Sequence, residues 1–167
     1  MDFSIQLAGL KNGNNEFKYE LGDVFFAEMG GEKILGGDVK AIVNIEKTGS
    51  QMRADVRIDG TVKTTCDRCL EEMEVEIENQ EEFGVKVGAE TSYEDEEMIT
   101  IAEDDGMLQM GERMYEMCLV AMPIVCVHED GGCNEKMIEI LEAHSASNNE
   151  EKSSDPRWDA LKNIINK

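Results

Sequence analysis

The stretch of sequence that decides the fold is VKAIVNIEKTGSQMRADVRIDGTVKTTCDRCLEEMEVEIE, residues 39–78. Between Val39 and Ile45 every second side chain is apolar, and the alternation resumes at Met52, after a turn at residues 48–50. A period of two is typical of strands that bury one face. We therefore expect consecutive antiparallel strands joined by short turns.

Two corners interrupt the pattern farther along the chain. Asp59-Gly60 is a strong signal for a tight hairpin, so it predicts that one strand ends near Ile58 and another begins near Val62. Cys66-Asp-Arg-Cys69 precedes residues 72–78, where apolar side chains alternate with glutamates. The sequence thus predicts that both cysteines lie at the tip of a hairpin.

Shorter patterns flank this region. Alternation at residues 3–7 and 17–21 predicts two more strands, whereas residues 23–29 are compatible with either a helical turn or a continued strand. Apolar residues spaced by three, four and seven, Met107 and Leu108 included, predict a helix near 105–122. A second short helix is expected from Asn134 to about His144.

The predicted fold class is α+β: an antiparallel sheet or partly open barrel, one main packed helix, a short second helix and a C-terminal tail helix. We expect residues 1–144 to form a single domain and residues 145–154, rich in Ser, Asn, Glu and Lys, to form a flexible linker. Residues 155–167 predict an amphipathic helix with a proline at its first position. Its apolar residues Trp158, Leu161 and Ile165 are the expected contacts to a partner, unless Trp158 packs back on the domain.

Charge narrows the class of partner. The chain of 167 residues has a formal net charge of -21, and between Glu71 and Asp105 fifteen acidic residues stand against one basic residue, Lys86. Nucleic-acid-binding proteins normally present a basic stripe, because neutralising phosphates supplies most of their non-specific affinity. The acidic stretch would repel bare RNA and attract a basic protein; the alternative is a surface that only aids solubility.

The cysteines point to a metal site. Cys66 and Cys69 have the spacing that commonly supplies half of a tetrahedral zinc site, and one later segment holds Cys126, His128 and Cys133. We predict a structural zinc ion bound by Cys66, Cys69, His128 and Cys133. Cys126 is an alternative to His128, because residues two apart share a face of an extended chain. The competing interpretations are buried free cysteines and a redox disulfide pair.

The sequence offers little for catalysis or for membrane insertion. It has no Gly-rich phosphate loop, no His-Glu-x-x-His motif and no nucleophile elbow, so we expect neither enzymatic activity nor a small-molecule substrate. No segment approaches the ~18 apolar residues of a membrane span, and the first residues do not resemble a signal peptide. We therefore expect a cytoplasmic protein.

Three segments resemble the YceD family, also called large ribosomal RNA subunit accumulation protein. They are Cys66-Asp-Arg-Cys69-Leu70, the stretch from Met122 to Cys133, and Asp155-Pro-Arg-Trp-Asp-Ala-Leu161. Each segment alone is a weak signal, whereas their combination and order are fairly specific. The resemblance covers the C-terminal two-thirds of the chain.

The resemblance implies a role in the accumulation of large-subunit ribosomal RNA, and hence in ribosome assembly. It favours His128 over Cys126 as a metal ligand, since family members carry His or Cys at that position and many keep the other three cysteines. The expected partner is a basic large-subunit ribosomal protein or a pre-ribosomal particle.

Two other functions stay open. In the first, the protein contacts ribosomal RNA directly through a local basic patch; the candidate residues are Arg53, Arg57, Lys63 and Arg68. Direct contact requires that these four residues converge on one face away from the acidic hairpin. In the second, the chain is a small zinc-stabilised interaction module unrelated to ribosomes.

Overall fold

The computed structural model describes residues 3–95 and 97–145. It divides into two compact units, Met1–Cys133 and Asn134–Lys167. The described part of the second unit is helix α3, Glu135–His144, as expected from the sequence. The Asn134 side chain caps it by accepting hydrogen bonds from the backbone N–H groups of Lys136 and Met137.

The first unit is built on a five-stranded sheet. Its strands are β2 (Gly13–Leu21), β3 (Gly36–Thr48), β4 (Gln51–Thr65), β5 (Glu72–Gly88) and β6 (Met98–Ala102), and they lie side by side in that order. Strands β2 to β5 are antiparallel neighbours, whereas β6 runs parallel to the end of β5. The α+β class is therefore confirmed, with an open sheet rather than a closed barrel.

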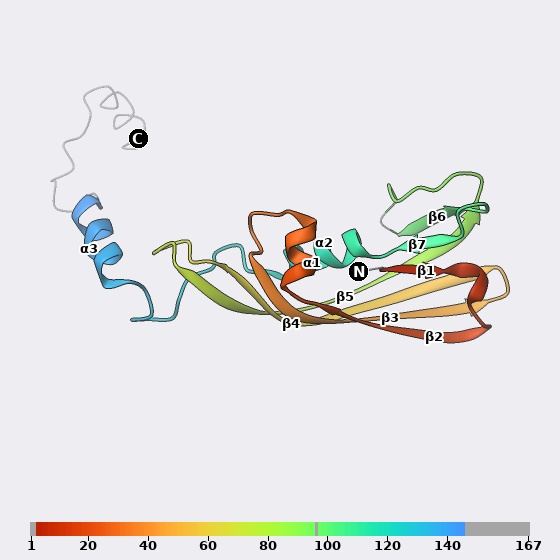
Figure 1. Ribbon diagram of the computed structural model, residues 1–167, viewed down its shortest axis with the longest axis horizontal. Coiled ribbons are helices and arrows are strands. Elements are labelled where there is room, and N and C mark those ends of the chain that lie inside the picture. The colour runs from red at the N-terminus through yellow and green to blue at the C-terminus, as the bar shows by residue number, and fades with distance from the viewer. Residues whose placement is uncertain (1–2, 96, 146–167) are drawn as a thin grey trace, which may run out of the picture. The chain divides into compact units, whose positions relative to one another are not determined.

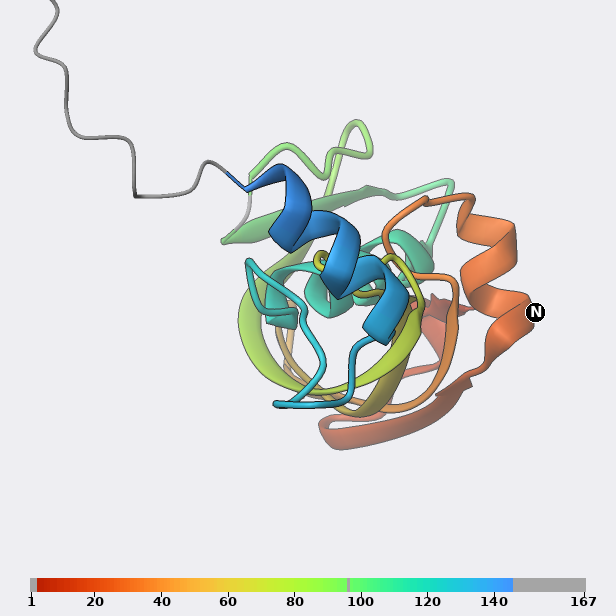
Figure 2. The ribbon, with the colours of Figure 1, turned by 90° about the vertical axis from the view of Figure 1, so that its left-hand side faces the viewer.

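A second layer covers one face of this sheet (Figure 1). It consists of a small antiparallel pair, β1 (Ser4–Gln6) and β7 (Met107–Gln109), a 3-10 turn at Leu7–Gly9, and the helices α1 (Asp23–Met29) and α2 (Gly111–Ala121). Figure 2 shows the large sheet curving around α2. The core lies between the layers, where the inward residues of the strands meet Phe26 of α1 and Met114 of α2, all almost fully buried.

The open question at residues 23–29 is answered by this packing. The segment is helical, and it ends at Gly30, whose left-handed backbone terminates many helices. Phe25 and Phe26 are both buried, at 2% and 1% exposure. The two adjacent rings enter the core against different partners: Phe25 packs on Phe3 with ring centroids 4.9 Å apart, and Phe26 lies 6.4 Å from the ring of Tyr115.

The predicted hairpin at Asp59-Gly60 is wrong. Strand β4 continues through both residues, and Gly60 lies opposite Val39 on β3 and Ile77 on β5. A Cβ atom at Gly60 would clash with the carbonyl oxygen of Asp38. Gly60 therefore allows β3 and β4 to approach each other closely. A close approach and a tight turn both favour glycine, because it has no Cβ atom.

The predicted start of the main helix is also wrong. Met107 and Leu108 belong to β7, and α2 begins only at Gly111. Strand β6 was not predicted at all. Both strands are short and gain their order from pairing with distant residues, in β1 for β7 and in β5 for β6.

The linker beyond Ser145 and the tail helix, with Trp158, Leu161 and Ile165, lie outside the described residues. None of the described helices has the length and apolar character needed to cross a lipid bilayer.

Candidate metal centre at the tip of the β4–β5 hairpin

The first half of the centre is the turn that joins β4 to β5. The backbone N–H of Leu70 donates to the carbonyl oxygen of Cys66 at 2.9 Å. The N–H of Cys66 donates to the carbonyl oxygen of Glu71 at 2.8 Å. Leu70 adopts a left-handed backbone with φ of 61°, which is uncommon for a residue other than glycine. This tight turn directs the side chains of Cys66 and Cys69 toward one point, as the sequence predicts.

The second half comes from the segment that follows α2. Here the chain reverses direction, with the N–H of Gly132 donating to the carbonyl oxygen of Glu129 at 2.9 Å and with φ of 83° at Gly131. The reversal brings Cys133 back beside His128. Segments almost sixty residues apart in sequence thus meet at one place.

The four side chains form a compact donor set. The sulfur of Cys66 lies 3.9 Å from that of Cys133, and the Nδ1 atom of His128 lies 3.4 Å from the Cys69 sulfur and 3.8 Å from the Cys133 sulfur. All four donor atoms lie within 4.8 Å of one another. A tetrahedral zinc site with bonds of about 2.0–2.3 Å has edges of about 3.3–3.8 Å, so the separations of 3.4, 3.8 and 3.9 Å are close to those of a metal of this kind.

The protonation of the cluster is shifted in different directions, and only the shift of Cys66 favours the metal-binding form. Burial raises the pKa of the Cys66 thiol, but hydrogen bonds from the backbone N–H groups of Cys69, His128 and Arg68 outweigh this effect and lower the pKa from 9.0 to about 6. A hydrogen bond with Cys66 raises the pKa of the His128 imidazole. Burial raises the pKa of the Cys133 thiol. The thiolate at Cys66 is the form that coordinates metals.

Cys126 lies apart from the four donors. Its thiol points to the carbonyl oxygen of Pro123 at 3.5 Å, and the residue is part of the hydrophobic core. Its backbone instead holds the two halves together: the N–H of Asp67 donates to the Cys126 carbonyl oxygen, and the N–H of Cys126 donates to Asp67 Oδ2, both at 2.7 Å. Asp67 was not singled out in the sequence, although its position between the paired cysteines was a usable signal.

The basic residues named for RNA contact do not form a separate patch. Arg53 forms an ion pair with Glu82, Arg57 donates to Gln80 Oε1 at 2.9 Å, and Lys63 lies 3.3 Å from Asp23. All three project from the outer face of β4. The fourth, Arg68, lies at the exposed hairpin tip.

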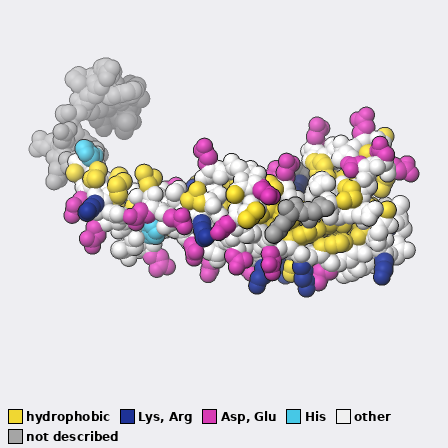
Figure 3. Space-filling view, in the orientation of Figure 1, with side chains coloured by type: hydrophobic (Ala, Val, Ile, Leu, Met, Phe, Trp, Pro, Cys, Tyr) yellow, Lys and Arg dark blue, Asp and Glu magenta, His cyan; other side chains and the backbone are white. Residues whose placement is uncertain are grey.

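Acidic residues occupy the neighbouring strand on the same face. Every second residue at the start of β5 is an exposed glutamate: Glu72, Glu74, Glu76 and Glu78. Lys63 lies directly opposite Glu74. Alternate residues repeat every ~7 Å along a strand. In Figure 3 acidic side chains recur across the visible surface, while the basic ones are fewer. The outer face of the hairpin therefore carries negative charge that the basic residues of β4 only partly offset.

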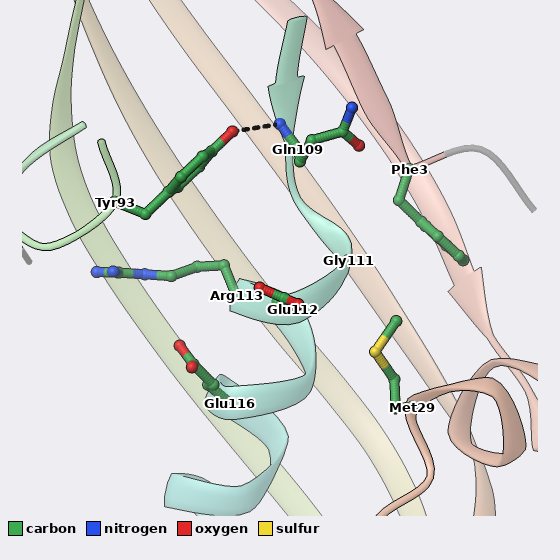
Figure 4. A pocket seen from close by; sticks show the side chains of 8 residues that line it. All are labelled: Phe3, Met29, Tyr93, Gln109, Gly111, Glu112, Arg113 and Glu116. Carbon is green, nitrogen blue, oxygen red and sulfur yellow. Dashed lines mark hydrogen bonds between the residues drawn. The ribbon is translucent and has the colours of Figure 1, made fainter. Parts of the chain in front are cut away.

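A cavity of about 490 Å³ lies between α2, the β1–β7 pair and the loop before β6 (Figure 4). The hydroxyl of Tyr93 accepts a hydrogen bond from the Gln109 N–H at 3.0 Å. Arg113 pairs with Glu81 at 2.8 Å and lies over the ring of Phe83. No local pattern in the sequence pointed to this cavity, because its walls come from four segments that are distant in sequence. Its lining residues are Phe3, Met29, Tyr93, Gln109, Gly111, Glu112, Arg113 and Glu116, with no Ser, Cys or His among them.

Comparison with known proteins supports the resemblance seen in the sequence. The family model described as large ribosomal RNA subunit accumulation protein YceD matches residues 54–165, more than half of the chain. Searches of curated proteins and of solved structures found no match. The matched range contains all four residues of the donor cluster. The chain therefore belongs to the YceD family.

Proposed function

We propose that the protein is a non-enzymatic ribosome-assembly factor that supports the accumulation of large-subunit ribosomal RNA by binding a basic ribosomal protein or a precursor particle. Family membership supplies the link to the large ribosomal subunit. The observation that carries the choice of partner is the row of glutamates on the exposed face of β5. A fixed array of like charges attracts and orients a partner of opposite charge.

The same face disfavours direct RNA binding. For Arg53 or Lys63 to contact a phosphate, the phosphate would have to compete with Glu82 or Asp23, which already pair with these side chains. It would also approach the neighbouring glutamates of β5. Phosphate neutralisation supplies most of the affinity of non-specific RNA binders, and this surface offers little of it.

The donor cluster would hold a structural zinc ion through Cys66, Cys69, His128 and Cys133. Three thiolates and one imidazole complete a tetrahedral site and leave no position open for a substrate. The ion would tie the hairpin tip to the segment after α2, and its binding would add to the free energy of folding. The proposed role is therefore stabilisation of the binding surface.

The partner assignment is tested by a pull-down with the full chain, with and without ribonuclease, followed by mass spectrometry. We expect basic large-subunit proteins to be captured under both conditions and to dissociate as salt rises. Replacing Glu74 and Glu76 by Gln should weaken capture more than replacing Glu16 and Glu20, which lie on the outer face of β2. Tight binding to ribosomal RNA fragments at about 0.15 M salt, with no binding to basic proteins, would make direct RNA binding the better assignment.

The metal assignment is tested by elemental analysis of protein purified without a chelator. We expect about one equivalent of zinc per chain and an increase in thermal stability when zinc is added to metal-free protein. Less than about a tenth of an equivalent, with no thermal shift, contradicts the proposal.

A further inference from the structure

Strand β5 has one edge that no strand covers near the hairpin tip. Its other edge pairs with β4 from Glu72 to Val85, and β6 pairs only with Gly84–Gly88. Helix α2 covers the middle of β5, where Asn79 donates to the Met117 carbonyl oxygen at 3.2 Å. Among the described strands, none pairs with the outer edge of Glu72–Ile77. An edge of this kind presents backbone N–H and C=O groups that can pair with another chain.

A groove of about 670 Å³ runs beside this edge. Met73 and Val75, both half-buried, line it from the strand, and Val125 and Val127 line it from the segment after α2. The donor cluster closes one part of the wall, since His128 also lines the groove. The floor is therefore apolar, and its two sides are held together by the cluster and by the Asp67–Cys126 hydrogen bonds.

Apolar side chains are unusually exposed along the wall. Val125, which lines the groove, is 62% exposed, and its neighbour Ile124, which does not line the groove, is 98% exposed. Large apolar residues gathered at a groove and left open to solvent commonly mark an interaction site. The rim is acidic, with Glu72 and Glu74 on the strand side and Glu129 on the opposite side.

We propose that an extended, basic segment of the partner protein lies in this groove and adds to the edge of β5 as a further strand. The proposal rests on the proposed function and specifies where the partner binds. Backbone pairing with residues 72–77 would supply affinity. Alternate side chains of the segment would meet the apolar floor, while its Lys and Arg residues would face the three glutamates of the rim.

The test uses the full chain with bound metal and a short labelled peptide in which Lys and Val alternate. We expect the peptide to slow hydrogen exchange of the alternate backbone amides of residues 72–77 that face away from β4, because these groups become hydrogen-bonded. A peptide in which Glu and Val alternate should not do so. Binding should weaken as salt rises.

Two matched pairs of variants locate the site. Val125→Ser should weaken peptide binding about tenfold through the loss of one buried aliphatic side chain, whereas Val120→Ser, on an exposed position of α2 outside the groove, should leave it unchanged. Glu74→Gln should reduce the salt dependence, and Glu20→Gln on β2 should not. The proposal would be overturned if the two valine variants weakened peptide binding equally, or if the two glutamate variants changed its salt dependence equally.

Other outcomes separate this proposal from the function it rests on. If Val125→Ser captures basic ribosomal proteins as well as the unchanged chain does, the groove assignment is wrong and the proposed function stands. If the unchanged chain captures none, the proposed function fails. Protection of residues 72–77 that grows with protein concentration, without peptide, would assign the edge to a second copy and overturn the proposal.

Discussion

The two ends of the β4–β5 hairpin are stabilised by different chemistry. Far from the tip, Ile58, Phe83 and Val85 are at most 3% exposed beneath the second layer. At the tip Met73 and Val75 are only half-buried, although their partners on β4, Thr64 and Val62, are 0% exposed. Beyond them the paired cysteines Cys66 and Cys69 are 0% and 2% exposed. One end of this pair of strands is therefore packed beneath a second layer, whereas four donor side chains gather at the other, where a bound metal would add stability.

The largest effect should follow from removing a ligand. We expect Cys69→Ala to lose the bound metal and to speed hydrogen exchange at the hairpin tip, residues 66–78, while amides of residues 52–58 stay protected. The reason is that the proposed metal ion would tie the hairpin tip to the segment after α2. Elemental analysis and hydrogen exchange measure both effects.

Cys126→Ala is the matched control, because this cysteine is equally buried but lies outside the donor set. It should retain the metal and the protection of the tip. Equal metal loss in both variants would mean that Cys126 is a ligand and would contradict the described geometry.

A core substitution tests the packed end. Met114 on α2 is fully buried, so Met114→Ala should lower the free energy of unfolding by about 2–5 kcal/mol. Val120→Ala, on the exposed side of the same helix, should change it by no more than about 0.5 kcal/mol. Urea unfolding followed by circular dichroism measures both values. A cost for Met114→Ala as small as that of the control would show that packing does not dominate at this end.

The boundary between the two ends lies near Gly60. Its φ is 156°, and a Cβ atom added to it would lie only 2.6 Å from the Val39 Cα atom, so there is little room for a side chain. We expect Gly60→Ala to cost about 1–3 kcal/mol of stability, measured by urea unfolding. Gly9→Ala, where nothing lies within 4 Å, should be nearly neutral. A neutral Gly60→Ala would instead fit a flexible turn at this position.

The smallest effect concerns the ion pair between Lys63 on β4 and Asp23 on α1. A hydrogen bond from the Gly37 N–H and the nearby Lys63 lower the pKa of the Asp23 carboxyl below its ordinary value of 3.8. Its contribution to stability is therefore complete above pH 3.8 and is lost as the pH falls through the lower, folded-state pKa. Asp23→Asn should reduce the slope of unfolding free energy against pH below about 4. An unchanged slope would show that the pair does not contribute.

The strands of the main sheet were largely predictable because their signal is local. Alternation at Val39–Ile45 and Met52–Ile58 reports which side of the backbone is buried, and that depends only on neighbouring residues. The signal failed at Gly60 and Met107, for two local reasons. A glycine in a turn and a glycine at a close approach look alike in sequence, and a three-residue strand is too short to show a period.

The sequence by itself determined the strand alternation, the acidic character of β5, and Cys66, Cys69 and Cys133 as members of the donor cluster. The family resemblance favoured His128 over Cys126, and the tertiary structure places His128 with the donors while the backbone of Cys126 is held by the N–H and the carboxylate of Asp67, a residue far away in the chain. The tertiary structure also decided that the edge of β5 is open and that a groove lies beside it. Side-chain periodicity is a local property, whereas the meeting of two segments and the pairing of an edge depend on the whole fold.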